Sequence, residues 1–125
     1  MSSNPGPLVL VVDDDDDLRE VLSEILDARG YAVDTAPDGA AALARLRGGL
    51  APAIILLDLR MPRMSGWEFC REQQRDPRLA GIPVLVLSGG STRGVAESLG
   101  ARDVLSKPID LDELATKLAC HHLKR

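Results

Sequence analysis

Charged or hydroxyl-bearing side chains follow four apolar segments of the chain. The apolar segments are residues 8–12, 53–57, 84–87 and 104–105. The polar residues at their ends are Asp13, Asp14, Asp58, Ser88 and, shortly after the last segment, Lys107. If the segments are parallel strands of one sheet, their carboxyl ends lie along one edge. Three carboxylates, a hydroxyl and an ammonium group would then converge in one crevice, which is the candidate functional site.

This set of groups is suited to metal-assisted phosphoryl transfer. Clustered carboxylates repel one another unless a cation lies between them, and hard oxygen ligands in a small site favour Mg²⁺. With the metal beside it, Asp58 would act as the nucleophile and give an aspartyl phosphate. Mg²⁺ and Lys107 would neutralise the transferred oxygens, which carry most of the charge in the transition state.

The first two candidate residues belong to a run of five aspartates, residues 13–17. We interpret residues 15–17 as a helix start, where acidic side chains cap the helix and complement its dipole. We assign Asp13 and Asp14 to the site instead, because they adjoin an apolar strand and have matching partners elsewhere in the chain.

Strand and helix patterns alternate five times. The expected helices follow the first strand as far as Gly30, then run from Pro37-Asp38-Gly39 to Gly48-Gly49, over residues 66–75, over residues 95–99, and from about Leu111 onward. Residues 31–36 form a short second strand, and residues 53–57 are apolar throughout, as expected of a central strand buried on both faces. Short links between such units predict an open, doubly wound α/β sheet.

Size and composition favour one compact domain. The chain has 125 residues, is 45% hydrophobic and carries a formal net charge of -4, which argues against direct binding to nucleic acid. No apolar stretch approaches the roughly 20 residues of a membrane span. Residues 1–7 are polar and proline-rich, lack an apolar signal core and are predicted to be a disordered tail. We therefore expect a cytoplasmic protein.

The two cysteines and the two histidines could have functional roles, but the sequence favours structural ones. Cys70 follows Phe69 in an apolar helix and is expected to be a small core residue, whereas Cys120 falls opposite the apolar stripe of the last helix and is expected to be exposed. His121 and His122 are adjacent in a helix and cannot face one ligand, so we interpret them as a solvated helix end.

Four strings in the sequence resemble the receiver domain of bacterial two-component response regulators. They are Val11-Val12-Asp13-Asp14, Leu56-Leu57-Asp58-Leu59-Arg60-Met61-Pro62 with Gly66, then Ser88, and finally Lys107-Pro108. Any one of them is a weak signal, whereas all four in order, each ending an expected strand, are a strong one. The resemblance covers nearly the whole chain.

The resemblance implies a fold. It is a flavodoxin-like, doubly wound five-stranded parallel sheet of order 2-1-3-4-5, with five helices. The receiver domain would span residues 8–125. The segment between Ser88 and Lys107 is about one helical turn shorter than is usual in the family, so a shortened fourth helix is expected.

The resemblance also implies a role for each site residue. Asp58 would be the phosphoacceptor, Ser88 the hydroxyl that contacts the phosphoryl group, and Lys107 the lysine of the site, with a cis Lys107-Pro108 bond. The implied Mg²⁺ ligands are Asp13, Asp14, Asp58 and the backbone carbonyl of Arg60.

Three positions that affect signalling differ from the family pattern or vary within it. Receivers commonly carry an aromatic residue three positions before the lysine, and Val104 stands there, so the usual signalling face is expected to respond differently. Arg60 and Gly90 occupy positions that influence the lifetime of the phosphoryl group in the family.

These features lead to one principal hypothesis and two alternatives. The principal one is a phosphoaccepting signalling module, not an enzyme, that receives phosphate from a sensor histidine kinase or phosphotransfer protein and changes its binding to a downstream protein. It would be a monomer or weak dimer, either stand-alone or excised from a larger protein. The alternatives are a degenerate receiver that binds partners without phosphorylation, and a Mg²⁺-dependent phosphohydrolase using Asp58. The last lacks a second acid two residues after the nucleophile, where Arg60 stands.

Overall fold

Five parallel strands alternate with five helices in the residues that the computed structural model describes, which are 6–61, 63–90 and 94–122. The strands are β1 (Leu8–Val12), β2 (Ala32–Ala36), β3 (Ile54–Asp58), β4 (Val84–Ser88) and β5 (Asp103–Ser106). The helices are α1 (Asp16–Ala28), α2 (Gly39–Arg47), α3 (Gly66–Arg75), α4 (Val95–Leu99) and α5 (Leu111–His122). The predicted alternation of elements is confirmed.

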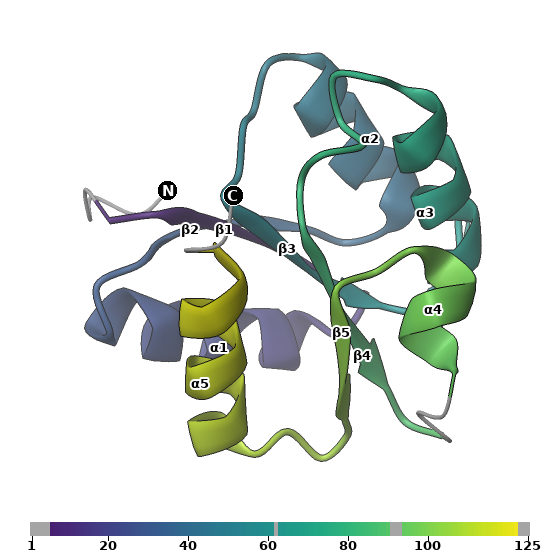
Figure 1. Ribbon diagram of the computed structural model, residues 1–125. Coiled ribbons are helices and arrows are strands. Elements are labelled where there is room, and N and C mark those ends of the chain that lie inside the picture. The colour runs from purple at the N-terminus through teal and green to yellow at the C-terminus, as the bar shows by residue number, and fades with distance from the viewer. Residues whose placement is uncertain (1–5, 62, 91–93, 123–125) are drawn as a thin grey trace.

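The strands form one parallel sheet in the order β2-β1-β3-β4-β5. Strand β3 lies at its centre, and the strand order reverses between β1 and β3 (Figure 1). The predicted doubly wound topology and strand order are therefore confirmed. The crevice beyond the carboxyl ends of β1 and β3 is where ligands bind in sheets of this kind.

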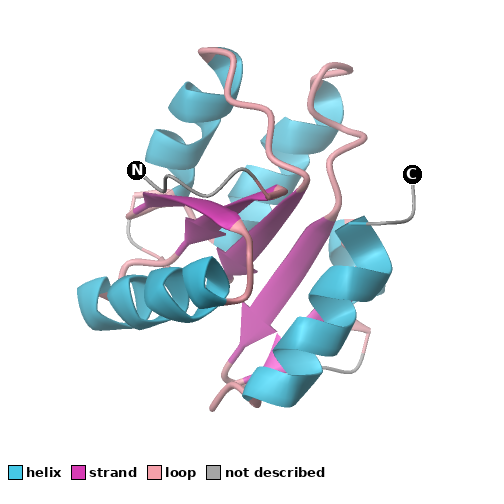
Figure 2. Ribbon diagram, turned by 90° about the vertical axis from the view of Figure 1, so that its left-hand side faces the viewer, coloured by secondary structure: helices cyan, strands magenta, loops and turns pink. Residues whose placement is uncertain are grey.

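Side chains alternate between two cores, one on each face of the sheet. In β3, Ile55 and Leu57 pack with residues of α2, α3 and α4, whereas Ile54 and Leu56 pack with residues of α1 and α5. Helices consequently cover both faces (Figure 2). Because both faces are buried, the central strands are apolar along their whole length and the polar residues are confined to their ends.

Side-chain caps fix the starts of the first three helices. The Asp15 carboxylate accepts a hydrogen bond from the Leu18 amide at 3.1 Å, and Asp38 accepts one from the Ala41 amide at 2.8 Å. At α3, Ser65 and Glu68 form a reciprocal capping box. The interpretation of Asp15 as a helix cap is confirmed, and this separates it from the two aspartates before it.

Helix α4 is short, as expected, with five residues. It lies between Gly94 and Gly100, both with a φ of 71°. The Gln74 side chain donates a hydrogen bond to the Leu99 carbonyl at 2.8 Å, which ties the end of α4 to α3. A Cβ at Gly100 would displace this Gln74 amide from its hydrogen bond, and the positive φ independently favours glycine there.

Some predicted boundaries shift by one residue, and some predictions fall on residues that are not described. Strand β2 starts at Ala32 rather than at residue 31, and β3 includes Asp58 as its last residue. Residues 1–5 of the predicted tail lie outside the described residues, and so does Pro62 of the motif after Asp58. At the end of the predicted tail, the Pro7 carbonyl accepts a hydrogen bond from the Ala32 amide at 3.0 Å. None of the described helices is long and apolar enough to cross a membrane.

Candidate functional site

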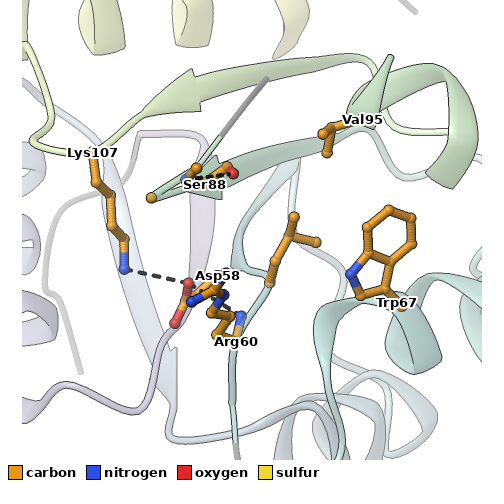
Figure 3. Close-up of a pocket in the computed structure, with 9 residues that line it drawn as sticks. Asp58, Arg60, Trp67, Ser88, Val95 and Lys107 are labelled. Carbon is orange, nitrogen blue, oxygen red and sulfur yellow. Dashed lines mark hydrogen bonds and ion pairs between the residues drawn. The ribbon is translucent and has the colours of Figure 1, made fainter. Parts of the chain in front are cut away.

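The predicted residues converge at the carboxyl edge of the sheet. Asp13 directly follows β1, Asp58 ends β3, Ser88 ends β4, and Lys107 directly follows β5. Three of them, Asp58, Ser88 and Lys107, are drawn in Figure 3, where the lysine side chain extends toward the carboxylate of Asp58. Residues from four strands, far apart in sequence, thus form one site.

Asp13 is the most deeply buried acid of the site, with no exposed surface. Its Oδ1 accepts a hydrogen bond from the Asp15 amide at 2.9 Å, and its backbone carbonyl accepts one from Arg19 Nη1 at 2.6 Å. Burial, reinforced by the nearby charge of Asp58, raises the pKa of Asp13 despite the opposing effects of the Asp15 amide and Lys107. The site therefore holds a carboxylate that gains from an additional cation.

Lys107 is shared between two carboxylates. Its Nζ lies 3.3 Å from Asp13 Oδ2 and 3.3 Å from Asp58 Oδ1. Burial favours the neutral amine, but the charges of the two aspartates outweigh it and raise the pKa of Lys107. Its backbone amide donates to the Ser88 carbonyl at 2.8 Å, and the Lys107-Pro108 bond is cis, as expected. The side chain is thus a charged ammonium fixed at the end of β5.

Asp58 presents its carboxylate at the bottom of the crevice, with 5% of the residue exposed. Besides Lys107, Oδ1 accepts a long hydrogen bond of 3.4 Å from the Arg60 amide. The Ser88 hydroxyl oxygen accepts an equally long one, 3.4 Å, from the Gly90 amide. Neither contact is tight, so both oxygens are free to reorganise around a bound group.

The acidic residues can hold a hard cation. Asp13, Asp14 and Asp58 each offer a carboxylate oxygen, and these oxygens lie within 4.8 Å of one another. Asp14 is exposed while the other two are buried, so the cluster opens to solvent on one side. Oxygen ligands of this number and openness fit Mg²⁺, which keeps several waters and takes few protein carboxylates. The Arg60 carbonyl as a fourth ligand stays a prediction.

A cavity of about 460 Å³ extends from Asp58 away from the acidic cluster. It is lined by Asp58, Leu59, Arg60, Trp67, Ser88, Gly89, Gly90, Val95 and Lys107. Figure 3 shows Trp67 and Val95 on the side of the cavity opposite Lys107. Sequence reasoning missed Trp67, Val95 and the Arg19 contact. The one available signal for Trp67 was its position next to Gly66, a motif residue.

Val104, the position where receivers commonly carry an aromatic residue, lies half-buried in β5 and packs against the core under α4. Its carbonyl accepts a hydrogen bond from Lys117 Nζ at 2.7 Å. Lys117 also pairs with Asp103 at 3.1 Å, so the backbone of β5 is tied to α5 at this point. Whether this face responds to phosphorylation stays a prediction.

The two cysteines lie as expected, and one histidine does not. Cys70 is buried, which raises the pKa of its thiol to about 11, and Cys120 is exposed. The interpretation of His121 as a solvated residue is wrong. Its Nε2 lies 3.1 Å from Asp103 Oδ2, and its side chain is only 15% exposed, because α5 packs alongside β5. The side chain of His122 lies outside the described part of the chain.

Comparison with known proteins identifies relatives of the whole domain. The family model for the response regulator receiver domain matches residues 9–119. The DNA-binding dual master transcriptional regulator RpaA of Synechocystis sp. is 36% identical over 90% of this chain and 47% of its own length. The response regulator PleD of Caulobacter vibrioides is 43% identical over 82% of this chain and 23% of its own length. The chain thus spans half or less of the length of these two relatives.

Solved structures agree with the sequence comparison. The receiver domain of a sensor histidine kinase from Pseudomonas aeruginosa superimposes with a TM-score of 0.84 at 28% identity, covering 94% of this chain and 98% of that one. That structure has a magnesium ion coordinated in its active-site cleft.

Proposed function

Because this chain belongs to the response regulator receiver family of two-component systems, we propose that it accepts a phosphoryl group on Asp58. The donor is a sensor histidine kinase or a phosphotransfer protein, and the reaction depends on Mg²⁺. The observation that carries the proposal is the position of Asp58 at the end of the central strand, 3.3 Å from the Lys107 ammonium and within the carboxylate cluster. A nucleophile, a counter-charge and a set of metal ligands are thereby gathered in one place.

In the proposed reaction a carboxylate oxygen of Asp58 attacks the phosphorus of the donor. A new oxygen–phosphorus bond forms as the bond from phosphorus to the donor nitrogen breaks, and the nitrogen keeps the electron pair. Lys107 balances negative charge on the transferred oxygens, and the Ser88 hydroxyl donates a hydrogen bond to one of them. Asp13, Asp14, Asp58 and the Arg60 carbonyl would hold Mg²⁺, which would supply further positive charge at those oxygens.

The protein assists this reaction on itself and has no separate substrate to turn over. The same groups would also promote hydrolysis of the acyl phosphate, because attack by water on its phosphorus places similar negative charge on the same phosphoryl oxygens as the Asp58 oxygen–phosphorus bond breaks. The fold and the family are those of signalling proteins. We therefore propose a phosphoacceptor domain that helps its own phosphorylation and dephosphorylation, not an enzyme in the ordinary sense.

Phosphorylation is proposed to change which protein the domain binds. Engagement of Ser88 by the phosphoryl group would bias the residues that follow it and, through them, α4, whose end is held by the Gln74 hydrogen bond and by the buried Leu99. Val104 has no large ring to reorient, so this change does not depend on an aromatic switch. The downstream target is a protein rather than nucleic acid, the domain is cytoplasmic, and it acts as a monomer or weak dimer.

The test is phosphotransfer from a panel of phosphorylated histidine kinases, with and without a chelator. We expect at least one kinase to label the protein, and to do so only when Mg²⁺ is present. A degenerate receiver would carry no label, and it would bind its partner equally well before and after incubation with the phosphorylated kinases. Labelling that is unaffected by chelation would contradict the proposed role of the acidic cluster.

A further inference from the structure

Trp67, the single tryptophan of this chain, is a large apolar side chain that is exposed. It is 45% exposed, whereas Phe69, two residues later in the same helix, is fully buried. The site described above does not use Trp67, yet it lines the same cavity as Asp58. Large exposed apolar side chains beside a polar site often mark a place where a partner group makes contact.

The backbone holds Trp67 at this place. The Gly66 amide donates a hydrogen bond to the Leu59 carbonyl at 2.9 Å. A Cβ added at Gly66 would lie 2.8 Å from both the Asp58 carbonyl oxygen and the Leu59 Cα, so α3 begins in direct contact with the end of β3. Trp67 follows one residue later in α3, so the packing of α3 against β3 sets the position of its backbone beside the cavity.

The cavity has two chemically different ends. Asp58, Ser88 and Lys107 form the polar end, and Trp67 and Val95 form the apolar end (Figure 3). A Cβ built at Gly89 or Gly90 would meet nothing within 4 Å. These two lining residues thus leave the cavity open where side chains could have filled it.

The geometry of phosphoryl transfer gives the apolar end a role. The attacking oxygen and the leaving atom lie roughly in line on opposite sides of the phosphorus. Asp58 is buried at the bottom of the cavity, so a leaving group must lie toward the open side, where the rim is formed by Arg60, Trp67 and Val95. A leaving group with an aromatic face would be held there by stacking and, if cationic, by the ring of Trp67.

We propose that Trp67 and Val95 hold the leaving group of the phosphoryl donor and that this rim selects an imidazole ring, as in phosphohistidine. This inference rests on the proposed function and adds the residues that recognise the donor. In the step, the phosphorus–nitrogen bond breaks as the Asp58 oxygen–phosphorus bond forms. The ring is protonated on its other nitrogen, so it accepts the electron pair and departs as neutral imidazole.

The test compares two small donors that transfer the same phosphoryl group. Monophosphoimidazole releases imidazole, and phosphoramidate releases ammonia, which has no ring to stack. The rate constant of phosphoprotein formation with Mg²⁺ is measured for the wild type, Trp67→Ala and Trp67→Phe. Val21→Ala is the matched control, because Val21 is an apolar side chain of similar exposure, 49%, on α1 and away from the cavity lining.

Trp67→Ala should slow the reaction with monophosphoimidazole about three- to tenfold, the effect of one lost aromatic contact. In Trp67→Ala, the rate with phosphoramidate should change by less than about twofold. Trp67→Phe should recover most of the rate lost with monophosphoimidazole, and Val21→Ala should leave the rates with both donors unchanged. Trp67→Leu keeps apolar bulk at the rim, so it provides the same comparison if the alanine variant is too unstable to study.

Equal losses with both donors, or no loss with either, would overturn the assignment of Trp67 and leave the proposed function intact. If neither donor labelled the wild type in the presence of Mg²⁺, the proposed function would be contradicted, and this inference with it.

Discussion

Lys107 Nζ lies 3.3 Å from Asp58 Oδ1, although the two residues are 49 positions apart in the chain. The same nitrogen lies 3.3 Å from Asp13 Oδ2. One ammonium group is therefore shared by two buried carboxylates, and the site has more negative than positive charge close by. This imbalance explains both the fit to a divalent cation and the dependence on Lys107 that we predict below.

Replacing Lys107 by alanine should retain the fold and slow phosphorylation of Asp58 by roughly 100-fold, because one positioned counter-charge at the transferred oxygens is lost. The rate of labelling by acetyl phosphate measures this. Lys117→Ala is the control, since Lys117 is also a partly buried lysine that pairs with an aspartate, but on α5. Wild-type labelling in Lys107→Ala would remove this residue from the site.

Mg²⁺ should stabilise the wild-type protein. A ligand that binds only the folded state at ten times its Kd contributes about 1.4 kcal/mol, which for a domain of this size raises Tm by about 5 °C. Asp14→Asn should weaken this shift and raise metal-free stability, because one of three crowded carboxylates is neutralised. Thermal melts with millimolar Mg²⁺ or a chelator measure both effects.

Asp17→Asn is the matched control for the metal experiment, because it removes a charge from the same run of aspartates but from the first turn of α1. It should keep the full Mg²⁺ shift. An absent Mg²⁺ shift in the wild type, together with a less stable metal-free Asp14→Asn, would contradict the acidic site as described.

Asp38 should make stability depend on pH in the acidic range. The hydrogen bond from the Ala41 amide, followed by that from Arg63 at 2.8 Å, holds the pKa of Asp38 below its ordinary 3.8. Since the folded-state pKa is lowered, ionised Asp38 stabilises the fold above pH 3.8, and this contribution is lost as the pH falls through the lowered value. Asp38→Asn keeps a capping oxygen but does not titrate.

The free energy of unfolding of wild type and Asp38→Asn should therefore differ most near pH 7 and converge below the folded-state pKa. Denaturant unfolding at a series of pH values measures the difference. Arg63→Ala, which removes the guanidinium and leaves the Ala41 hydrogen bond to Asp38 in place, should give part of the same effect. A difference that stays constant with pH would show that the ion pair does not act in this way.

Val104 should contribute to stability more than to signalling. Val104→Ala removes half-buried methyl groups and should cost about 1 kcal/mol, while leaving the pattern of amide-exchange changes on phosphorylation intact. Val84→Ala is the control, because Val84 packs in the same core but from the start of the neighbouring strand β4, far from the Ser88 end of that strand. If the response is lost only in Val104→Ala, this residue carries the switch.

The sequence predicted the features that local pattern determines. Apolar runs that end in Asp13 or Asp58 located the strands and their polar ends, and the motif at Asp38-Gly39 marked the start of α2. The short α4 followed from the small number of residues between Ser88 and Lys107. These predictions succeeded because each depended on neighbouring residues or on the fixed direction of parallel strands.

The features that were missed depend on distances between elements. The contacts of Arg63 with Asp38 and of His121 with Asp103 join residues 25 and 18 positions apart. No local pattern distinguishes such pairs from solvated side chains, because they form only after the helices have packed. The place of Trp67 at the cavity rim likewise follows from the close approach of Gly66 to β3.

The proposed function requires that Asp58 carry the phosphoryl group. The most direct measurement is to phosphorylate the protein in the presence of Mg²⁺, reduce the acyl phosphate with borohydride, and locate the reduced residue by peptide mass spectrometry. We predict modification at Asp58 alone and none in Asp58→Asn. Modification at another residue, or label that persists in Asp58→Asn, would contradict it.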